Sequence, residues 1–164
     1  MIAIINYGVG NLFSLQSSFA AIGQEAVVTS DEETIRRADR VILPGVGAFR
    51  DAALKLRDSG MDRVVKREAA AGKPLLGICL GMQLLFERSF EYGEHEGLSL
   101  LKGEIRPIAE RIPAGLKIPQ MQPLCHKGTH TICRLVHIGM RRIYCNIIFQ
   151  GTGNHPPHRV CRGN

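Results

Sequence analysis

The sequence lacks any apolar run long enough to cross a membrane. Its longest apolar stretches have the length of strands, whereas a transmembrane helix needs about 20 consecutive apolar residues. Residues 1–5 also lack the basic region, the extended apolar segment and the cleavage site of a signal peptide. We therefore expect a cytoplasmic protein with no membrane partner.

The cysteine content argues against a disulfide scaffold. Five cysteines leave one unpaired in any pairing scheme, and without a secretory signal the thiols are expected to stay reduced. A length of 164 residues is about that of one domain with one hydrophobic core. The packing of that core, and not a set of disulfides, is expected to hold the fold.

Acidic residues are missing from the last part of the chain. All 15 Asp and Glu residues lie at or before Glu110, so the net charge of +6 belongs to the residues after Met121. The same segment holds most of the cysteines and histidines, namely Cys125, Cys133, Cys145, Cys161, His126, His130, His137, His155 and His158. This break predicts a core of residues 1–121 and an atypical basic, Cys- and His-rich tail of residues 122–164.

Two binding functions can be weighed for this tail. Thiolate and imidazole are zinc ligands, but the spacing of Cys125, His126, His130, Cys133 and His137 lacks the paired CxxC pattern of zinc modules. The basic residues of the tail form no recognisable nucleic-acid module and are a weak electrostatic footprint. We predict no metal site, no cofactor and no nucleic-acid partner.

Up to Gly103, short apolar runs alternate with segments of helical period. The predicted strands are residues 2–5, 26–29, 40–43, 75–78 and 100–105. The predicted helices are residues 12–22, a short helix through Arg37 opened by a capping box of Ser30 and Glu33, two helices from Phe49 and from Met61, and residues 82–88. This repeated order indicates an α/β fold with a parallel sheet and right-handed crossovers. Beyond Gln122 there is no sustained period, and segments such as residues 143–149 are candidate strands.

One pentapeptide has the spacing of a nucleophile elbow. Gly77-Ile78-Cys79-Leu80-Gly81 stands between a predicted strand and a predicted helix, with Cys in place of the usual Ser. The flanking glycines allow a sharp, strained turn that lifts the thiol above the sheet edge, and the following helix N-terminus favours the thiolate. A lone cysteine is more often a buried structural residue, but this context favours a nucleophile at Cys79.

A second glycine-rich loop supports the first. Gly45 to Ala48 follow a predicted strand, and their N–H groups, with the N–H of Leu80, can donate to the oxyanion that forms in an acyl-transfer reaction. A Pro-Gly-x-Gly turn alone is also common in ordinary strand-to-helix connections. Both loops leave strands at their carboxyl ends, which is where parallel sheets bind ligands.

Four motifs carry a family resemblance over roughly the first 120 residues. They are Tyr7-Gly8-Val9-Gly10-Asn11-Leu12, Leu43-Pro44-Gly45-Val46-Gly47-Ala48-Phe49, Gly77-Ile78-Cys79-Leu80-Gly81-Met82-Gln83, and Glu96-Gly97-Leu98 with Gly103. In order and spacing the chain resembles the glutaminase subunit of imidazole glycerol phosphate synthase, a class I glutamine amidotransferase of histidine biosynthesis. The resemblance implies a flavodoxin-like, doubly wound, mostly parallel sheet.

The resemblance also implies a reaction and a partner. Glutamine would be hydrolysed through a thioester on Cys79, with Gly47 at the oxyanion strand, and ammonia would pass to a (β/α)₈ cyclase subunit in a heterodimer. Gln83 matches a contact with glutamine, and Glu91 matches a carboxylate that faces the amino group of the substrate. Asn11 would lie towards the partner subunit. Without the family resemblance, Gln83 and Glu91 could equally be polar residues on the protein surface, and Asn11 could be the N-cap of a helix.

The resemblance stops near Met121. The family continues with Gly-Trp-Asn and with a late His-Pro-Glu that completes a Cys-His-Glu triad, whereas this chain has Gln122-Pro123-Leu124 and its His155-Pro156 precedes another proline. We hypothesise a shifted reading frame near codon 122, which resequencing would test, and we expect negligible glutaminase activity. The alternatives are a non-catalytic partner-binding remnant, another class I amidotransferase, or a chain that does not fold stably.

Overall fold

The computed structural model describes residues 1–107, 131–138 and 141–148. In chain order its elements are β1 (Ile2–Ile5), α1 (Leu12–Ala21), β2 (Ala26–Thr29), α2 (Glu32–Arg37), β3 (Arg40–Leu43), α3 (Phe49–Asp58), α4 (Met61–Ala70), β4 (Leu75–Ile78), α5 (Leu80–Gln83), β5 (Phe86–Ser89), β6 (His95–Glu96), β7 (Leu101–Ile105), β8 (Thr131–Ile138) and β9 (Arg141–Ile148).

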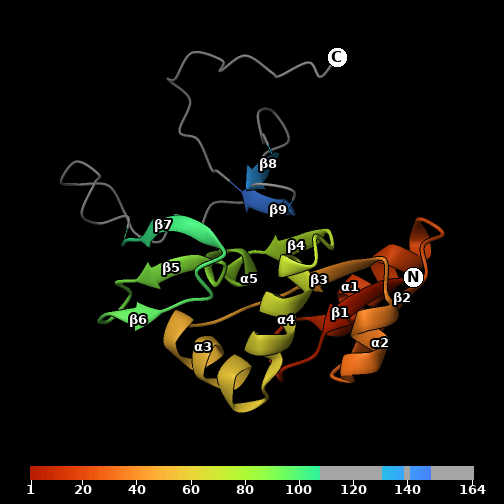
Figure 1. Cartoon of the computed structure of the whole chain (residues 1–164), viewed down its shortest axis with the longest axis horizontal. Coiled ribbons are helices and arrows are strands. Elements are labelled where there is room, and N and C mark those ends of the chain that lie inside the picture. Colours follow the sequence, from red (N-terminus) through yellow and green to blue (C-terminus); the bar gives the residue numbers. More distant parts are fainter. Residues whose placement is uncertain (108–130, 139–140, 149–164) are drawn as a thin grey trace.

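The main sheet has six strands in the order β2-β1-β3-β4-β9-β8 (Figure 1). All neighbouring pairs are parallel except β8 and β9, which form an antiparallel hairpin. The order of β2, β1, β3 and β4, with one more parallel strand beside β4, is that of flavodoxin-like sheets. The prediction of a doubly wound, mostly parallel sheet is thus confirmed, and the candidate strand at residues 143–149 corresponds to β9.

Helices cover both faces of this sheet because alternate residues of its strands point to opposite sides. On one face, Ala3 and Ile5 of β1 pack with α2, α3 and α4 in the larger hydrophobic cluster, in which Phe49 is fully buried. On the other face, Ile2, Ile4 and Ile42 pack against the partly buried apolar residues of α1. The larger cluster also contains Leu43 and Leu80, which adjoin the two glycine-rich loops.

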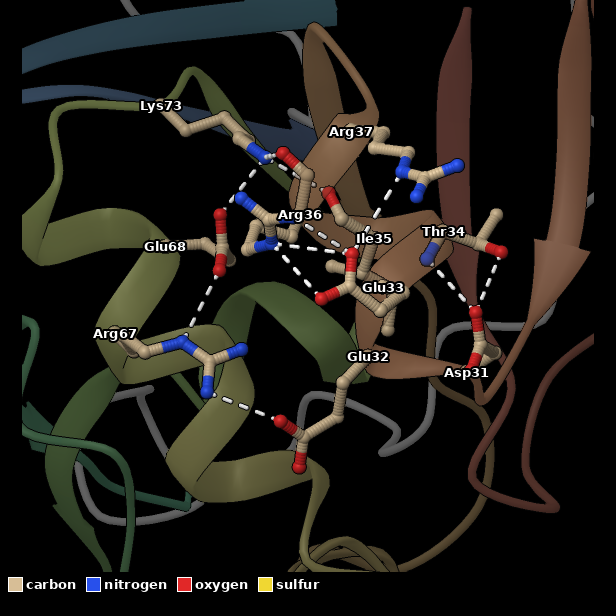
Figure 2. A network of polar contacts seen from close by, with 10 residues as sticks. All are labelled: Asp31, Glu32, Glu33, Thr34, Ile35, Arg36, Arg37, Arg67, Glu68 and Lys73. Carbon is tan, nitrogen blue, oxygen red and sulfur yellow. Dashed lines mark hydrogen bonds and ion pairs between the residues drawn. The ribbon is translucent and has the colours of Figure 1, made fainter.

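An ion network joins α2, α4 and the turn before β4 (Figure 2). Glu68 of α4 is only 5 % exposed and lies 2.8 Å from Lys73 Nζ and 3.2 Å from Arg67 Nε. Lys73 Nζ also donates to the carbonyl oxygens of Ile35 and Arg36 at the end of α2, each at 2.8 Å. One ammonium group therefore ties a buried carboxylate to the last turn of another helix.

A second, smaller sheet stands at one end of the main sheet, next to α3 in Figure 1. Its order is β6-β5-β7, with β5 antiparallel to β6 and parallel to β7. Arg57 of α3 donates to the carbonyl oxygen of Glu96 in β6 at 2.8 Å. This hydrogen bond joins β6 to the last turn of α3.

Two local predictions were wrong. The N-cap of α2 is Asp31 and not Ser30, because the Asp31 carboxylate accepts the Thr34 N–H at 2.8 Å. The helix expected at residues 82–88 ends at Gln83, and β5 follows. The carbonyl oxygens of Leu84 and Leu85, which a longer helix would use, instead accept N–H groups of residues 98–101.

No helix in residues 1–107 is long and apolar enough to cross a membrane, and the longest, α1, α3 and α4, have 10 residues each.

Candidate active site

Cys79 occupies the single position between β4 and α5. Its backbone has φ 54° and ψ −120°, a strained conformation for a residue with a side chain. The thiol is free and the residue is exposed. A strained, exposed cysteine between a strand and a helix is the geometry that the Gly-x-Cys-x-Gly pattern predicts.

The two flanking glycines are required by close backbone packing. A Cβ added at Gly77 would come within 2.5 Å of Met82 Cα, and one added at Gly81 would overlap the carbonyl oxygen of Leu43. A Cβ at Gly45 would come within 2.5 Å of Gly81 N. The start of the Gly45–Ala48 loop therefore lies directly against the backbone that follows Cys79.

This loop carries the predicted oxyanion donors. Gly47 has φ 90°, is exposed, and has no atom within 4 Å of the place where a Cβ would stand. Leu80 is the first residue of α5, so its N–H has no acceptor inside the helix. The structure thus brings Leu80 and the loop of Gly47 to the same edge of the sheet. The N–H groups of Leu80 and Gly47 take no part in helix or strand hydrogen bonds there.

Tyr7 anchors the first part of the loop. Its hydroxyl donates to the carbonyl oxygen of Pro44 at 2.7 Å, and the side chain is only 4 % exposed. Burial raises the pKa of the Tyr7 phenol above its ordinary value, so it remains a donor. Tyr7 stands in one of the sequence motifs, but this role could not be predicted because its partner lies 37 residues away.

Gln83 and Asn11 lie on the two elements that flank the loops. Gln83 ends α5, one turn after Cys79, and is partly buried. Asn11 is exposed and caps α1, since its Oδ1 accepts the Ser14 N–H at 3.3 Å. The capping role of Asn11 is confirmed, while its place towards a partner and the contact of Gln83 with glutamine stay predictions.

Glu91 follows β5 and reaches the start of α3. Its Oε2 accepts the N–H of Phe49 at 2.9 Å, in a partly buried position. The same helix has Ala48 at its N-cap, which offers no side-chain acceptor. Glu91 is therefore not the free surface acid that one reading of the sequence allowed, and its contact with a substrate stays a prediction.

The combination of elbow, loop and fold agrees with a match to a known family model. Residues 2–120 match the CobB/CobQ-like glutamine amidotransferase domain. This chain belongs to that amidotransferase family. A crystal structure of a glutamine amidotransferase, 20 % identical, has the same fold with a TM-score of 0.56, and the match covers 65 % of this chain and 56 % of that one.

Similar proteins support the closer resemblance within the amidotransferases. The imidazole glycerol phosphate synthase subunit HisH of Sulfurimonas denitrificans is 52 % identical over 122 residues, which are 74 % of this chain and 59 % of the relative. HisH of Bacillus cereus is 54 % identical over 121 residues, which are 74 % of this chain and 56 % of the relative. The resemblance to the glutaminase subunit is confirmed, and the chain spans less than two thirds of these relatives.

A hollow of about 280 Å³ lies beside the site of this amidotransferase domain. Its lining is residues 8–10, residues 46–48 and the α3 residues Asp51, Ala52 and Lys55. Gly47 is shared between the hollow and the predicted oxyanion loop, whereas Cys79 does not line it. The hollow therefore lies on the side of the loop that faces Gly8–Gly10.

In the described part of the chain, no general base is hydrogen-bonded to Cys79. Within the described residues, no side chain forms a hydrogen bond with its thiol, and no group of three His, Cys, Asp or Glu could hold a metal ion. The considered tail ligands Cys125, His126 and His130 lie outside the described residues, as do the side chains of Cys133 and His137. Within the described part of the chain, the predicted nucleophile Cys79 thus has no base hydrogen-bonded to it.

Proposed function

We propose that this chain is a glutamine amidotransferase subunit of imidazole glycerol phosphate synthase, in histidine biosynthesis. It would supply ammonia from glutamine to a (β/α)₈ cyclase subunit, with which it would form a heterodimer in the cytoplasm. The observation that carries the proposal is the strained, exposed Cys79 packed against the Gly45–Ala48 loop. The HisH relatives support the choice of this synthase among amidotransferases.

The proposed reaction begins at the thiolate of Cys79. Sγ attacks the amide carbon of glutamine, and the charge that develops on the carbonyl oxygen is stabilised by the N–H groups of Leu80 and Gly47. The carbon–nitrogen bond then breaks, and ammonia leaves after taking up a proton. Water attacks the resulting thioester and releases glutamate and the free thiol.

The remaining residues would bind glutamine and the partner. Gln83 would contact the substrate from the end of α5, and Glu91 would face its amino group. Asn11 follows residues 8–10 of the first β–α loop, which line one side of the hollow, and we assign this loop to the surface that faces the cyclase. No resident cofactor or metal takes part in this scheme.

Turnover by this chain should be negligible even if the half-site is assembled. A thiol without a general base can be alkylated, but it does not transfer protons efficiently to the leaving ammonia. We propose that residues 1–121 are the amidotransferase core and that residues 122–164 replace the family sequence after a frameshift. Resequencing that offers no insertion or deletion restoring Gly-Trp-Asn and His-Pro-Glu would refute the frameshift.

Covalent labelling tests the proposed half-site. The reagent is the chloromethyl ketone analogue of glutamine, in which CH₂Cl replaces the amide NH₂, and modification is located by peptide mass. Selective labelling of Cys79 over Cys125, Cys133, Cys145 and Cys161 is expected. Equal labelling of all five would contradict the proposal. Steady ammonia release above that of Cys79→Ala would contradict the expected lack of turnover.

A further inference from the structure

The N–H of Phe49 has an acceptor that comes from a distant part of the chain. Glu91 Oε2 accepts it at 2.9 Å across 42 positions of sequence. Phe49 is the first residue of α3, so this N–H has no acceptor inside the helix, and the N-cap Ala48 provides none. A carboxylate at a helix N-terminus also interacts favourably with the helix dipole and forms a strong, charge-assisted hydrogen bond.

This hydrogen bond closes the loop that contains Gly47. At its front, the loop is held by the Tyr7–Pro44 hydrogen bond and by Gly45 packed on Gly81. At its back, the chain enters α3 at Phe49, whose side chain is fully buried. Gly47 lies between these anchors, and no other atom lies within 4 Å of the place where its Cβ would stand, so its backbone direction depends on both anchors.

Glu91 is itself held in place. Its N–H donates to Ser89 Oγ at 3.2 Å, and Ser89 is fully buried. The next two residues, Tyr92 and Gly93, have φ 52° and 118°, so the chain turns away sharply after Glu91. Within the described residues, the second carboxylate oxygen, Oε1, accepts no hydrogen bond. One oxygen is therefore engaged with the loop, and the other can meet an ammonium group.

We propose that Glu91 is a positioning residue for the oxyanion loop, in addition to facing the substrate. This inference rests on the proposed glutaminase function. Through Oε2 it fixes the Ala48–Phe49 peptide and so sets the direction of the Gly47 N–H. When the amino group of glutamine binds Oε1, the same carboxylate contacts the substrate and holds the loop that stabilises the oxyanion.

Two variants separate the two roles. Glu91→Gln keeps a carbonyl oxygen for the Phe49 N–H but loses the charge that attracts an ammonium group, whereas Glu91→Ala loses both. The matched control is Glu94→Ala, because Glu94 is an exposed acid on the same loop that pairs with Arg88 and not with Phe49. The full chain is used for every variant.

The measurements are the saturation kinetics of Cys79 labelling by the chloroketone and the hydrogen exchange of the Phe49 amide. In the labelling step Sγ displaces chloride and forms a thioether, with the ketone oxygen in the oxyanion loop. For Glu91→Gln we expect weaker reagent binding, a nearly unchanged maximal rate and a protected Phe49 amide. For Glu91→Ala we expect the maximal rate to fall about 10- to 100-fold and the amide to lose protection. Labelling by iodoacetamide, which has no amino acid group, should change little in either variant.

Different failures overturn different statements. If Cys79 is labelled selectively but the maximal rates of wild type, Glu91→Gln and Glu91→Ala are equal, the positioning role is wrong and the proposed function stands. An unchanged exchange rate of the Phe49 amide in Glu91→Ala would also refute the positioning role. If the wild type labels all cysteines alike, the proposed function fails, and the role given to Glu91 fails with it. A loss in Glu94→Ala as large as in Glu91→Ala would show a general effect of the loop and would refute the specific hydrogen bond.

Discussion

Replacement of Lys73 by methionine should strongly destabilise the fold, although Lys73 lies outside the candidate active site. The ammonium group contacts Glu68 Oε2 and donates to two carbonyl oxygens at the end of α2, all at 2.8 Å (Figure 2). Lys73→Met keeps the aliphatic part of the side chain but leaves the Glu68 carboxylate, 5 % exposed, without its nearest cation. The expected loss therefore comes from a stranded charge and not from lost packing.

The magnitude follows from what remains around Glu68. Removing one partner of a buried ion pair costs about 3–5 kcal/mol. Arg67 Nε stays 3.2 Å from the other carboxylate oxygen, but its side chain is half-exposed, so it compensates only in part. We expect Lys73→Met to lower the free energy of unfolding by about 2–4 kcal/mol, a large part of the ~5–15 kcal/mol of a typical domain.

Urea unfolding followed by far-UV circular dichroism measures this loss. Lys66→Met is the matched control, because Lys66 lies exposed on α4 and makes no ion pair within the described residues, so its effect should stay within about 0.5 kcal/mol. The double variant Glu68→Met with Lys73→Met should be more stable than Lys73→Met alone, since no buried charge is left. If Lys73→Met behaves like Lys66→Met, or if the double variant is the less stable one, the reasoning about the stranded carboxylate is wrong.

Three further changes test other contacts. Burial raises the pKa of Glu68, but its hydrogen bonds and ion pairs with Lys73 and Arg67 outweigh burial and lower that pKa below its ordinary value. The stability that Glu68 contributes above about pH 4.5 should therefore be lost as acid protonates it, so urea titrations of Glu68→Gln should show a smaller acid-dependent loss than those of the unmodified chain; an equal loss would contradict this. Tyr7→Phe leaves a buried carbonyl oxygen unpaired and should lower the free energy of unfolding by about 1–3 kcal/mol; an unchanged urea midpoint would contradict this. Gly81→Ala brings a methyl group onto the Leu43 carbonyl and should destabilise the fold by about 1–3 kcal/mol and abolish selective chloroketone labelling. Gly23→Ala is strained by its φ of 70° but meets no other atom within 4 Å, so it should leave labelling intact; equal labelling of both variants would count against the close packing.

The part of the site that local sequence encodes could be predicted. β4, the strained Cys79 and α5 follow each other within a few residues, and glycines are needed wherever the backbone comes too close for a Cβ. The strands β1, β2, β3 and β4 could be predicted with their bounds because each is a short apolar run between turn signals. Short-range patterns therefore sufficed for the sheet edge and for the strained turn at Cys79.

The part that depends on distant contacts could not be predicted. The period of residues 82–88 favours a helix, yet residues 98–101 take the carbonyl oxygens that the helix would use, and β5 forms instead. The hydrogen bond from Phe49 to Glu91 joins residues with no local relation, so only the family resemblance pointed to Glu91. In both cases tertiary pairing outweighs local preference.

The contact of Gly45 with Gly81 has a consequence for how Cys79 can lose its reactivity. At this contact two main-chain segments touch with no side chain between them, so no rotamer change can absorb a small separation. The backbone segments of Gly45 and Gly81 therefore either stay in contact or separate completely. The enhanced reaction of Cys79 with the chloroketone should thus disappear all at once with the cooperative melting of the sheet, and the thiol can serve as a reporter of whether a molecule is folded.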